Sequence, residues 1–122
     1  MKLHLTANTG LQLFTGYGAG YVAVNTVRYE QCVLVTPQVV TAWAVTGFDA
    51  LTGADFGFID DLKPEIVIFG TGATQRFPRP ELARALAAAG KGMEVMDTRA
   101  ACRTYNILAS ESRKVVAAIL VE

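Results

Sequence analysis

The segment 96–113, MDTRAACRTYNILASESR, carries the densest group of side chains that could do chemistry. Arg99 and Arg103 stand four positions apart, and at about 100° per residue Asn106 and Ser110 continue the same face of a helix. Guanidinium groups bind carboxylates and phosphates through paired hydrogen bonds. Because two arginines one turn apart repel each other, the pattern predicts that an anion lies between them.

The sequence offers two sources for that anion. One is internal: Glu94, Asp97 or Glu111, the last with Arg113 nearby, would form an ion-pair network with the two arginines, because buried arginines are usually paired within their own chain. The other is a carboxylate or phosphate from a ligand or partner. The sequence leaves both interpretations open.

A second polar feature is the loop Gly70-Thr71-Gly72, which follows the apolar run 66–69. A dinucleotide fingerprint needs Gly-x-Gly-x-x-Gly leading directly from a strand into a helix. Here Gln75 stands at the third glycine, and Pro78 and Pro80 delay the helix, since a proline disfavours αR geometry in the residue before it. We interpret the loop as a structural turn or a small-anion loop, with a nucleotide site as the remaining alternative.

Conventional catalysis finds little support in the residues. His4, the single histidine, lies at an N-terminus expected to be mobile. We therefore expect no catalytic Ser–His or Cys–His pair. Cys102 is the best nucleophile, because nearby arginines and a helix N-terminus lower a thiol pKa, but the helical wheel favours a buried thiol. Asp60 and Asp61 are adjacent in sequence, so their side chains point in different directions, which favours a solvated turn over a metal site. No catalytic residue, metal or cofactor is therefore expected.

Composition narrows the function further. The chain has 122 residues, of which 52% are apolar and 18% charged, which favours a single domain with apolar surface left for a protein partner. The charges of eleven basic and eleven acidic side chains cancel, so the protein has no overall positive electrostatic field that would attract nucleic acid. No apolar segment approaches the roughly 20 residues that cross a bilayer, and a signal-peptide pattern is absent. We expect a cytoplasmic protein without nucleic-acid binding or membrane insertion.

The elements that must position these residues differ between the two halves of the chain. Residues 1–45 are rich in Val, Thr, Tyr and Trp, with turn signals at 25–26, 30–31 and 36–37 and a glycine cluster at 16–20, which predicts short antiparallel strands with a turn or bulge at the cluster. Residues 46–65 form a connector with one short helix, capped by Thr52 and Asp55 and carrying Phe56, Ile59 and Leu62.

From residue 66 the hydrophobic period alternates between strand and helix. We expect strands at 66–69, 93–96 and 115–121 and helices at 81–89 and 98–110. Pro80 suits the first turn of its helix and Gly90 the position just beyond its end, while Asp97 or Thr98 suits the N-cap of the second helix. This pattern predicts an α/β half at 66–122 within a single domain at 1–122.

Residues 66–121 closely resemble a small domain family of unknown function, which includes the mitochondrial complex I assembly factor 3 and adipogenesis-associated proteins. The resemblance is carried by Gly-Thr-Gly after a strand at 70–72, Met-Asp-Thr at 96–98, Ala-Cys-Arg-Thr-Tyr-Asn at 101–106, and the pair Glu111 and Arg113. Two departures are Thr26, where a glycine-bearing turn is usual, and Lys91-Gly92-Met93, where Gly-Ile is usual. Neither departure touches the polar block.

The resemblance implies a three-layer domain with a central mixed sheet that ends in a strand antiparallel to its neighbours. It implies no established enzymatic activity and, for the mitochondrial branch, a role in assembling a respiratory membrane complex. We therefore expect a non-catalytic interaction or assembly-factor-like protein with a protein partner. The alternative is a small-anion or nucleotide-binding domain. The candidate ligand or partner residues are Gly70, Thr71, Gly72, Asp97, Thr98, Arg99, Cys102, Arg103, Asn106, Glu111 and Arg113.

Overall fold

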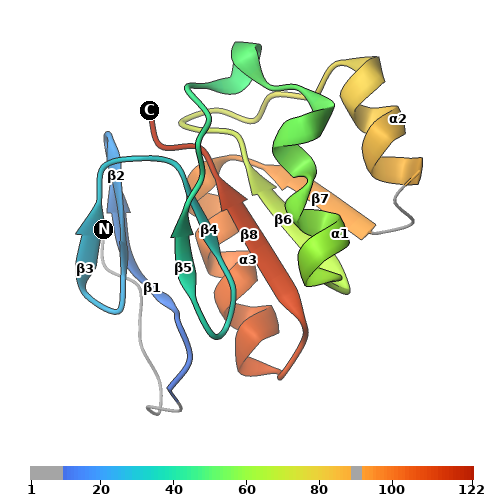
Figure 1. Cartoon of the computed structure of the whole chain (residues 1–122). Helices are drawn as coiled ribbons and strands as arrows, with labels where there is room; N and C mark the ends of the chain where they lie inside the picture. The colour runs from blue at the N-terminus through green and yellow to red at the C-terminus, as the bar shows by residue number, and fades with distance from the viewer. Residues whose placement is uncertain (1–9, 89–91) are drawn as a thin grey trace.

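The N-terminal strands form a small antiparallel sheet in the computed structural model, which describes residues 10–88 and 92–122 (Figure 1). Its order is β1 (Phe14–Gly18), β2 (Tyr21–Val24) and β3 (Val27–Tyr29). The glycine cluster contains both expected features: the β1–β2 register shifts between Phe14 and Gly16, and Gly20 has a positive φ of 76°.

 That positive φ of 76° places Gly20 in the left-handed region, which a tight hairpin turn requires and which glycine adopts without strain. The predicted antiparallel strands are confirmed.

The turn between β2 and β3 also lies where the sequence predicts it. Asn25 and Thr26 have φ values of 47° and 72°, the left-handed geometry of a two-residue hairpin turn. Thr26 is unusual there because it is β-branched. Its backbone N–H is nevertheless fixed by a hydrogen bond to Thr15 Oγ1 at 2.8 Å. The turn therefore keeps its geometry without a glycine at either central position.

The central sheet has five strands in the order β5-β4-β8-β6-β7. Strand β4 pairs antiparallel with β5 and β8, whereas β6 pairs parallel with β7 and β8. The sheet is therefore mixed, as expected, and its edge strand β5 is antiparallel to its neighbour. The bounds are β4 Val33–Val35, β5 Val40–Ala42, β6 Ile66–Gly70, β7 Gly92–Met96 and β8 Val115–Ile119.

Two helices connect the parallel strands. Helix α2 (Pro80–Ala88) follows β6, and α3 (Thr98–Ser110) follows β7, which confirms the βαβαβ-like half. Asp97 is the N-cap of α3, and its Oδ1 accepts the Ala100 N–H at 2.9 Å. The predicted cap at Gly90 lies outside the described residues, as do His4 and Lys91.

The connector differs from its prediction of one short helix. The structure has two 3₁₀ segments, η1 (Phe48–Ala50) and η2 (Gly53–Phe56), followed by α1 (Phe58–Leu62). Thr52 precedes η2, and its N–H donates to Asp55 Oδ2 at 2.8 Å, so the predicted cap is present. Asp60 and Asp61 are exposed on α1 rather than in the predicted turn.

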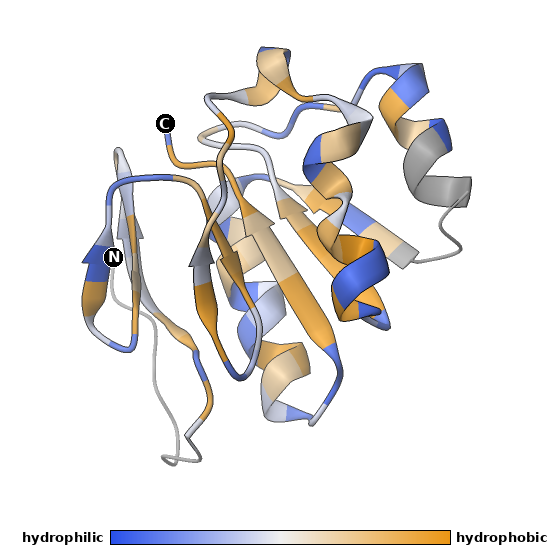
Figure 2. Cartoon of the chain, viewed as in Figure 1, coloured by the Kyte–Doolittle hydropathy of each residue, from blue (hydrophilic) through white to orange (hydrophobic). Residues whose placement is uncertain are grey.

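The core lies on both faces of the central sheet, because successive side chains of a strand point to opposite faces. Ile68 packs with α3 and the small sheet in one cluster, while Val67 and Phe69 pack with the connector and α2 in the other. The central strands are accordingly the most hydrophobic part of the chain (Figure 2). The result is the predicted three-layer α/β arrangement; that residues 1–122 form a single domain stays a prediction.

This topology brings two loops and residues 120–122 to one edge of the sheet. The carboxyl ends of β6, β7 and β8 meet there, since the three strands are parallel. The chain leaves β6 toward α2 on one face and leaves β7 toward α3 on the other. In open α/β sheets ligands bind in the crevice at such a switch point.

Candidate functional site

The loop Gly70-Thr71-Gly72 lies against the first turn of α3. A Cβ on Gly70 would lie 3.0 Å from Ala101 Cβ and 3.0 Å from Ile119 Cδ1, so only glycine allows the helix to approach β6 this closely. The Gly72 N–H donates to Thr98 Oγ1 at 2.9 Å, and the Thr98 N–H donates to the Gly72 carbonyl at 2.8 Å. The sequence correctly indicates that the glycine loop does not lead directly into α2. It does not reveal that the loop instead contacts the first turn of α3.

The polar groups of the loop are used within the protein. Thr71 is fully buried; its N–H donates to the Met96 carbonyl at 2.9 Å and its hydroxyl to the Thr74 carbonyl at 2.7 Å. The Thr71 carbonyl accepts two hydrogen bonds from the Arg76 guanidinium. With the Gly72 N–H also taken, the loop has the hydrogen bonding of a structural turn, and the amides of Thr71 and Gly72 are not available to a phosphate.

The two arginines of α3 do not form the internal ion-pair network that was one of the two interpretations. Among the described residues no carboxylate lies within ion-pair distance of Arg99 or Arg103, and segments 1–9 and 89–91 contain no Asp or Glu. Arg103 instead donates to the Tyr17 hydroxyl at 3.2 Å. The internal interpretation is wrong because Glu111 lies at the opposite end of α3, about 18 Å from Arg99 and about 12 Å from Arg103 by helical rise.

Asn106 belongs to the architecture and not to the loop. Its Oδ1 accepts the Phe14 N–H at 2.9 Å, and its Nδ2 donates to the Phe14 carbonyl at 2.8 Å. Asn106 therefore fixes β1 against α3 across 92 positions of sequence. It lies about 12 Å along the helix from Thr98, so the structure does not bring Asn106 and the loop together around one ligand.

Two further candidates lie outside the loop region. Arg113 pairs with Glu65, with 3.7 Å between Nε and Oε1, and Glu111 is the exposed C-cap of α3. Asp97 is occupied as the N-cap. Of the eleven candidates, the structure thus gathers Gly70, Thr71, Gly72, Asp97, Thr98 and Arg99 at one edge of the sheet.

Cys102 is fully buried on the apolar face of α3, as the helical wheel predicts. Burial raises the pKa of its thiol far above the ordinary value of 9.0, and the smaller opposing effect of Arg103 does not compensate. The expectation that neighbouring arginines activate this thiol fails because desolvation is the larger effect. Cys102 is a core residue, not a nucleophile.

In a Cys32→Ser variant, where Cys102 is the single thiol, we expect native protein to react with a disulfide reagent at pH 8 at least about 100-fold more slowly than unfolded protein, because reaction requires opening of the core. Above pH 9 the free energy of unfolding should fall, since only the unfolded thiol then loses its proton. Absorbance of the released reagent and denaturation at pH 7 and 10 measure both effects. Rapid modification of the native protein would contradict this assignment.

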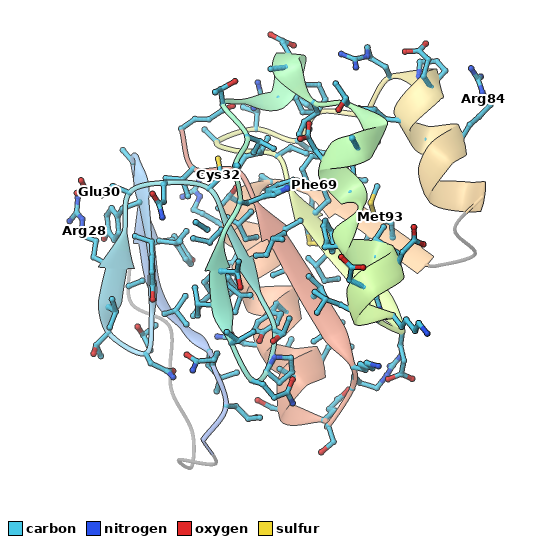
Figure 3. The ribbon with its side chains drawn as sticks, in the orientation of Figure 1. Arg28, Glu30, Cys32, Phe69, Arg84 and Met93 are labelled. Atoms are coloured by element: carbon cyan, nitrogen blue, oxygen red, sulfur yellow. The ribbon has the colours of Figure 1, made fainter. Side chains whose placement is uncertain are left out.

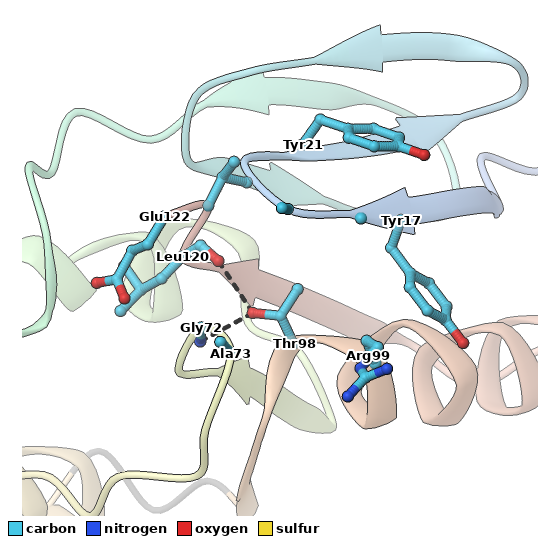
Figure 4. A pocket seen from close by; sticks show the side chains of 11 residues that line it. Tyr17, Tyr21, Gly72, Ala73, Thr98, Arg99, Leu120 and Glu122 are labelled. Carbon is cyan, nitrogen blue, oxygen red and sulfur yellow. Dashed lines mark hydrogen bonds between the residues drawn. The ribbon is translucent and has the colours of Figure 1, made fainter. Parts of the chain in front are cut away.

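A cavity of about 270 Å³ opens beside the glycine loop. The β1–β2 hairpin contributes Tyr17 and Tyr21, and the start of α3 contributes Thr98 and Arg99 (Figure 4). The Thr98 hydroxyl, which accepts the Gly72 N–H, donates to the Leu120 carbonyl at 2.9 Å, so helix, loop and the end of β8 are joined here. The remaining lining residues are Gly18, Ala19, Gly72, Ala73, Leu120, Val121 and Glu122.

Eight of the eleven lining residues were not among the sequence candidates, and those with polar side chains are Tyr17, Tyr21 and Glu122. The glycine cluster at 16–20 was the available signal for the two tyrosines, because it predicts a hairpin turn that brings the ends of β1 and β2 together. Glu122 has no local signal; it is identified only by its ion pair with Arg76, at 2.6 Å between Oε1 and Nη2. Among the described residues no group of three or more His, Cys, Asp or Glu side chains could hold a metal ion.

Residues 14–120 match the family model described as "Protein of unknown function (DUF498/DUF598)". The chain belongs to this family. The match spans both sheets and all the elements that surround the cavity. It confirms the resemblance that the 70–72 and 96–113 motifs carry.

Two relatives show how far the sequence similarity extends. Assembly factor 3 of the NADH dehydrogenase [ubiquinone] 1 alpha subcomplex from Bos taurus is 35% identical over 103 residues, which cover 83% of this chain and 55% of the relative. The chain thus spans about half the length of this relative. The "13 kDa major membrane protein" of Francisella tularensis subsp. holarctica (strain LVS) is 28% identical over 109 residues, covering 88% of this chain and 89% of that protein.

Solved structures share the fold. A protein from Bordetella parapertussis has a TM-score of 0.85 at 41% identity, covering 95% of this chain and all of the other. A Mth938-like domain from Bordetella pertussis has a TM-score of 0.79 at 36% identity, covering 99% of this chain and 92% of the other. Within residues 10–88 and 92–122 no helix is long and apolar enough to span a membrane.

Proposed function

We propose that this chain is a non-catalytic, assembly-type protein that binds a protein partner through the β6–α2 loop, residues 71–79. The observation that carries the proposal is Phe77, whose side chain is 75% exposed in the middle of that loop. Single exposed apolar residues are ordinary. Phe77 differs because the residues on both sides of it are fixed to the rest of the molecule.

The loop is held by three of its side chains. Gln75 donates to the Val95 carbonyl at 2.9 Å, and the Arg76 guanidinium binds Thr71 and Glu122 and lies over the Phe48 ring at 4.7 Å. After Phe77, the guanidinium of Arg79 donates to the Asp49 and Leu51 carbonyls. The aromatic ring is therefore presented on an ordered backbone, which lowers the entropy lost when a partner binds.

An aromatic residue in such a position suits a protein interface. Aromatic side chains are enriched at the buried centres of interfaces, and a few such residues supply most of the binding energy. The names of the relatives supply the finer part of the proposal. Because assembly factor 3 is named for an NADH dehydrogenase complex, we propose that the partner is a subunit or intermediate of a respiratory complex. Cytoplasmic placement and the lack of nucleic-acid binding stay predictions.

Phe77→Ala should reduce partner recovery at least tenfold, since truncating a central aromatic residue costs about 2 kcal/mol or more of binding free energy. The measurement is quantitative mass spectrometry after affinity purification of the chain from cells that express it at native level. Ile107→Ala is the matched control, because Ile107 is 60% exposed on α3, away from the loop. The control should retain the partner.

The outcomes separate the two parts of the proposal. Stoichiometric recovery of NADH dehydrogenase subunits, lost in Phe77→Ala, supports both. A different stoichiometric protein lost in the same variant supports the interaction role and rejects the respiratory one. Equal recovery by Phe77→Ala and wild type, or repeated recovery of the chain alone, would reject the interaction role at this loop.

A second candidate function is the binding of a small anion. It is favoured by one observation: Arg99 lines the cavity and has no ion pair within the described part of the chain. An unpaired guanidinium beside a cavity suits a carboxylate or phosphate. The nucleotide version of this candidate has less support, because the amides of Thr71 and Gly72 are already used within the protein.

A further inference from the structure

Strand β7 is the last strand of the central sheet and has a neighbouring strand, β6, on one side only (Figure 1). In a parallel pair the main-chain N–H and C=O groups of every second residue point toward the neighbour. The Met96 carbonyl accepts the N–H of Thr71, which directly follows β6, at 2.9 Å. Met96 and Glu94 thus direct their main-chain groups toward β6, and Met93 and Val95 direct theirs away from the sheet.

The side chain of Gln75 agrees with this direction. Its Nε2 donates to the Val95 carbonyl at 2.9 Å, as the N–H of a further strand would. Within residues 10–88 and 92–122, the Val95 N–H and both main-chain groups of Met93 make no hydrogen bond. A row of main-chain donors and acceptors of this kind pairs with an extended polypeptide. The outer edge of β7 therefore fits a peptide segment and not a small molecule.

The side chains of β7 indicate what such a segment carries. Met93, labelled in Figure 3, and Val95 are partly buried and pack against the core cluster beneath the connector and α2. Glu94 points to the opposite face, because successive side chains alternate. It is exposed, and no cation of the described residues lies within ion-pair distance of it. Apolar side chains on the first face and a Lys or Arg on the second match this pattern.

The same carboxylate disfavours a second copy of this chain as the added strand. Antiparallel pairing of two β7 strands about a two-fold axis, with Met93 opposite Val95 of the second copy, places Glu94 opposite Glu94. Like charges directly opposite each other destabilise a sheet, and charged side chains commonly prevent edge-to-edge association. A different protein with a basic residue at that position gains an ion pair instead.

The outer edge of β7 is continuous with the loop proposed above as the partner-binding site. The Gln75 side chain reaches this edge, and Phe77 follows two residues later, so the Cα atoms of Gln75 and Phe77 are at most about 7 Å apart. The Phe77 side chain is 75% exposed. One partner segment can therefore pair with β7 and cover the Phe77 ring at its end.

We infer that the partner adds an extended segment to the outer edge of β7, with apolar side chains beside Met93 and Val95 and a basic side chain beside Glu94. The inference rests on the proposed function, because it states how the partner of the 71–79 loop binds and which residues its segment carries. It does not depend on the cavity beside Arg99.

The test compares two variants of one edge residue in the same affinity purification as Phe77→Ala. Val95→Pro removes the outward N–H without removing a hydrogen bond to β6, the position at which an edge strand tolerates proline; it should reduce partner recovery at least tenfold. Val95→Ala is the matched control, because it shortens the same side chain but keeps the N–H, and it should retain the partner. Thermal unfolding of both variants checks that they fold.

The charge is tested separately. Glu94→Lys should reduce partner recovery at least threefold, because it places a cation beside the basic side chain of the segment. Asp60→Lys is the control, since Asp60 is an exposed carboxylate on α1, and it should retain the partner. Equal recovery by Glu94→Lys and wild type overturns the basic character of the segment.

Hydrogen–deuterium exchange at single-residue resolution tests the pairing without any substitution. In the recovered wild-type complex, the amides of Met93 and Val95 should exchange at least tenfold more slowly than in the chain alone. The amides of Glu94 and Met96, which point toward β6, should change little. This pattern, together with loss of the partner in Val95→Pro and its retention in Val95→Ala, supports the inference.

The other outcomes separate this inference from the proposed function. A partner that is lost in Phe77→Ala but kept in Val95→Pro, or unchanged exchange at Met93 and Val95 in the complex, overturns the inference and leaves the proposed function standing. Slow exchange of these two amides in the chain alone also overturns it, and slowing that increases with protein concentration assigns the edge to a second copy. Repeated recovery of the chain alone overturns both.

Discussion

Replacement of Asn106 by leucine is expected to lower the free energy of unfolding by about 3 kcal/mol, because it leaves two buried backbone groups without partners. Asn106 Oδ1 and Nδ2 bind the N–H and the carbonyl of Phe14 at 2.9 and 2.8 Å. Phe14 is fully buried, and its ring packs edge-on against Tyr105, with 5.3 Å between centroids. Water therefore cannot easily replace the lost hydrogen bonds.

The effect is measurable by urea denaturation and by thermal unfolding. At a few degrees per kcal/mol for a chain of this size, the melting temperature should fall by roughly 10 °C. Ser110→Ala is the control, because Ser110 is exposed at the end of the same helix; it should change stability by less than about 0.5 kcal/mol. A loss below 1 kcal/mol for Asn106→Leu would show that β1 does not depend on this side chain.

Gly70→Val should destabilise the protein by about 2–3 kcal/mol, as expected for overpacking in a close-packed core. Even a Cβ at this position would lie 3.0 Å from Ala101 Cβ, 3.0 Å from Ile119 Cδ1 and 3.1 Å from Thr98 Oγ1. Valine adds two more methyl groups to that space. Helix α3 would have to move away from β6, which also strains the hydrogen bonds that join Thr98 to Gly72 and Leu120.

A graded series distinguishes overpacking from other causes. Gly70→Ala should cost less than Gly70→Val, since it introduces only the Cβ. Ala44→Val is the control at an exposed position and should change the denaturation midpoint little. If Gly70→Val has the stability of the wild type, the helix can relax away from the strand and the glycine is not required for packing.

Local sequence chemistry determined most of the secondary structure. Helix α3 spans Thr98–Ser110, with Asp97 as its cap, because an acidic N-cap and a long apolar face act within a few residues of each other. The hairpin turns at 19–20 and 25–26 likewise follow from residues at the turn itself. The connector was less predictable: Phe56 and Ile59 show helical spacing, but the chain divides it between η2 and α1.

The sequence was sufficient to select candidate residues, but not to predict which other residues surround them in the fold. The sequence identified both arginines and the glycine loop, but it could not tell Arg99, which lines a cavity without an acidic partner among the described residues, from Arg103, which contacts Tyr17. It placed Asn106 with them because the three share one helix face. The structure shows that this face meets β1, so Asn106 has a structural role.

By itself the sequence determined the α/β class, the strands and helices of the second half, the family, and a helix with an unusual polar face. Only the tertiary structure decided which distant segments meet: α3 against Gly70, β1 against Asn106, and Glu122 against Arg76. The physical reason is range. Capping and periodicity act over a few residues, whereas these tertiary contacts join groups from 26 to 92 positions apart, and they depend on how the whole core packs.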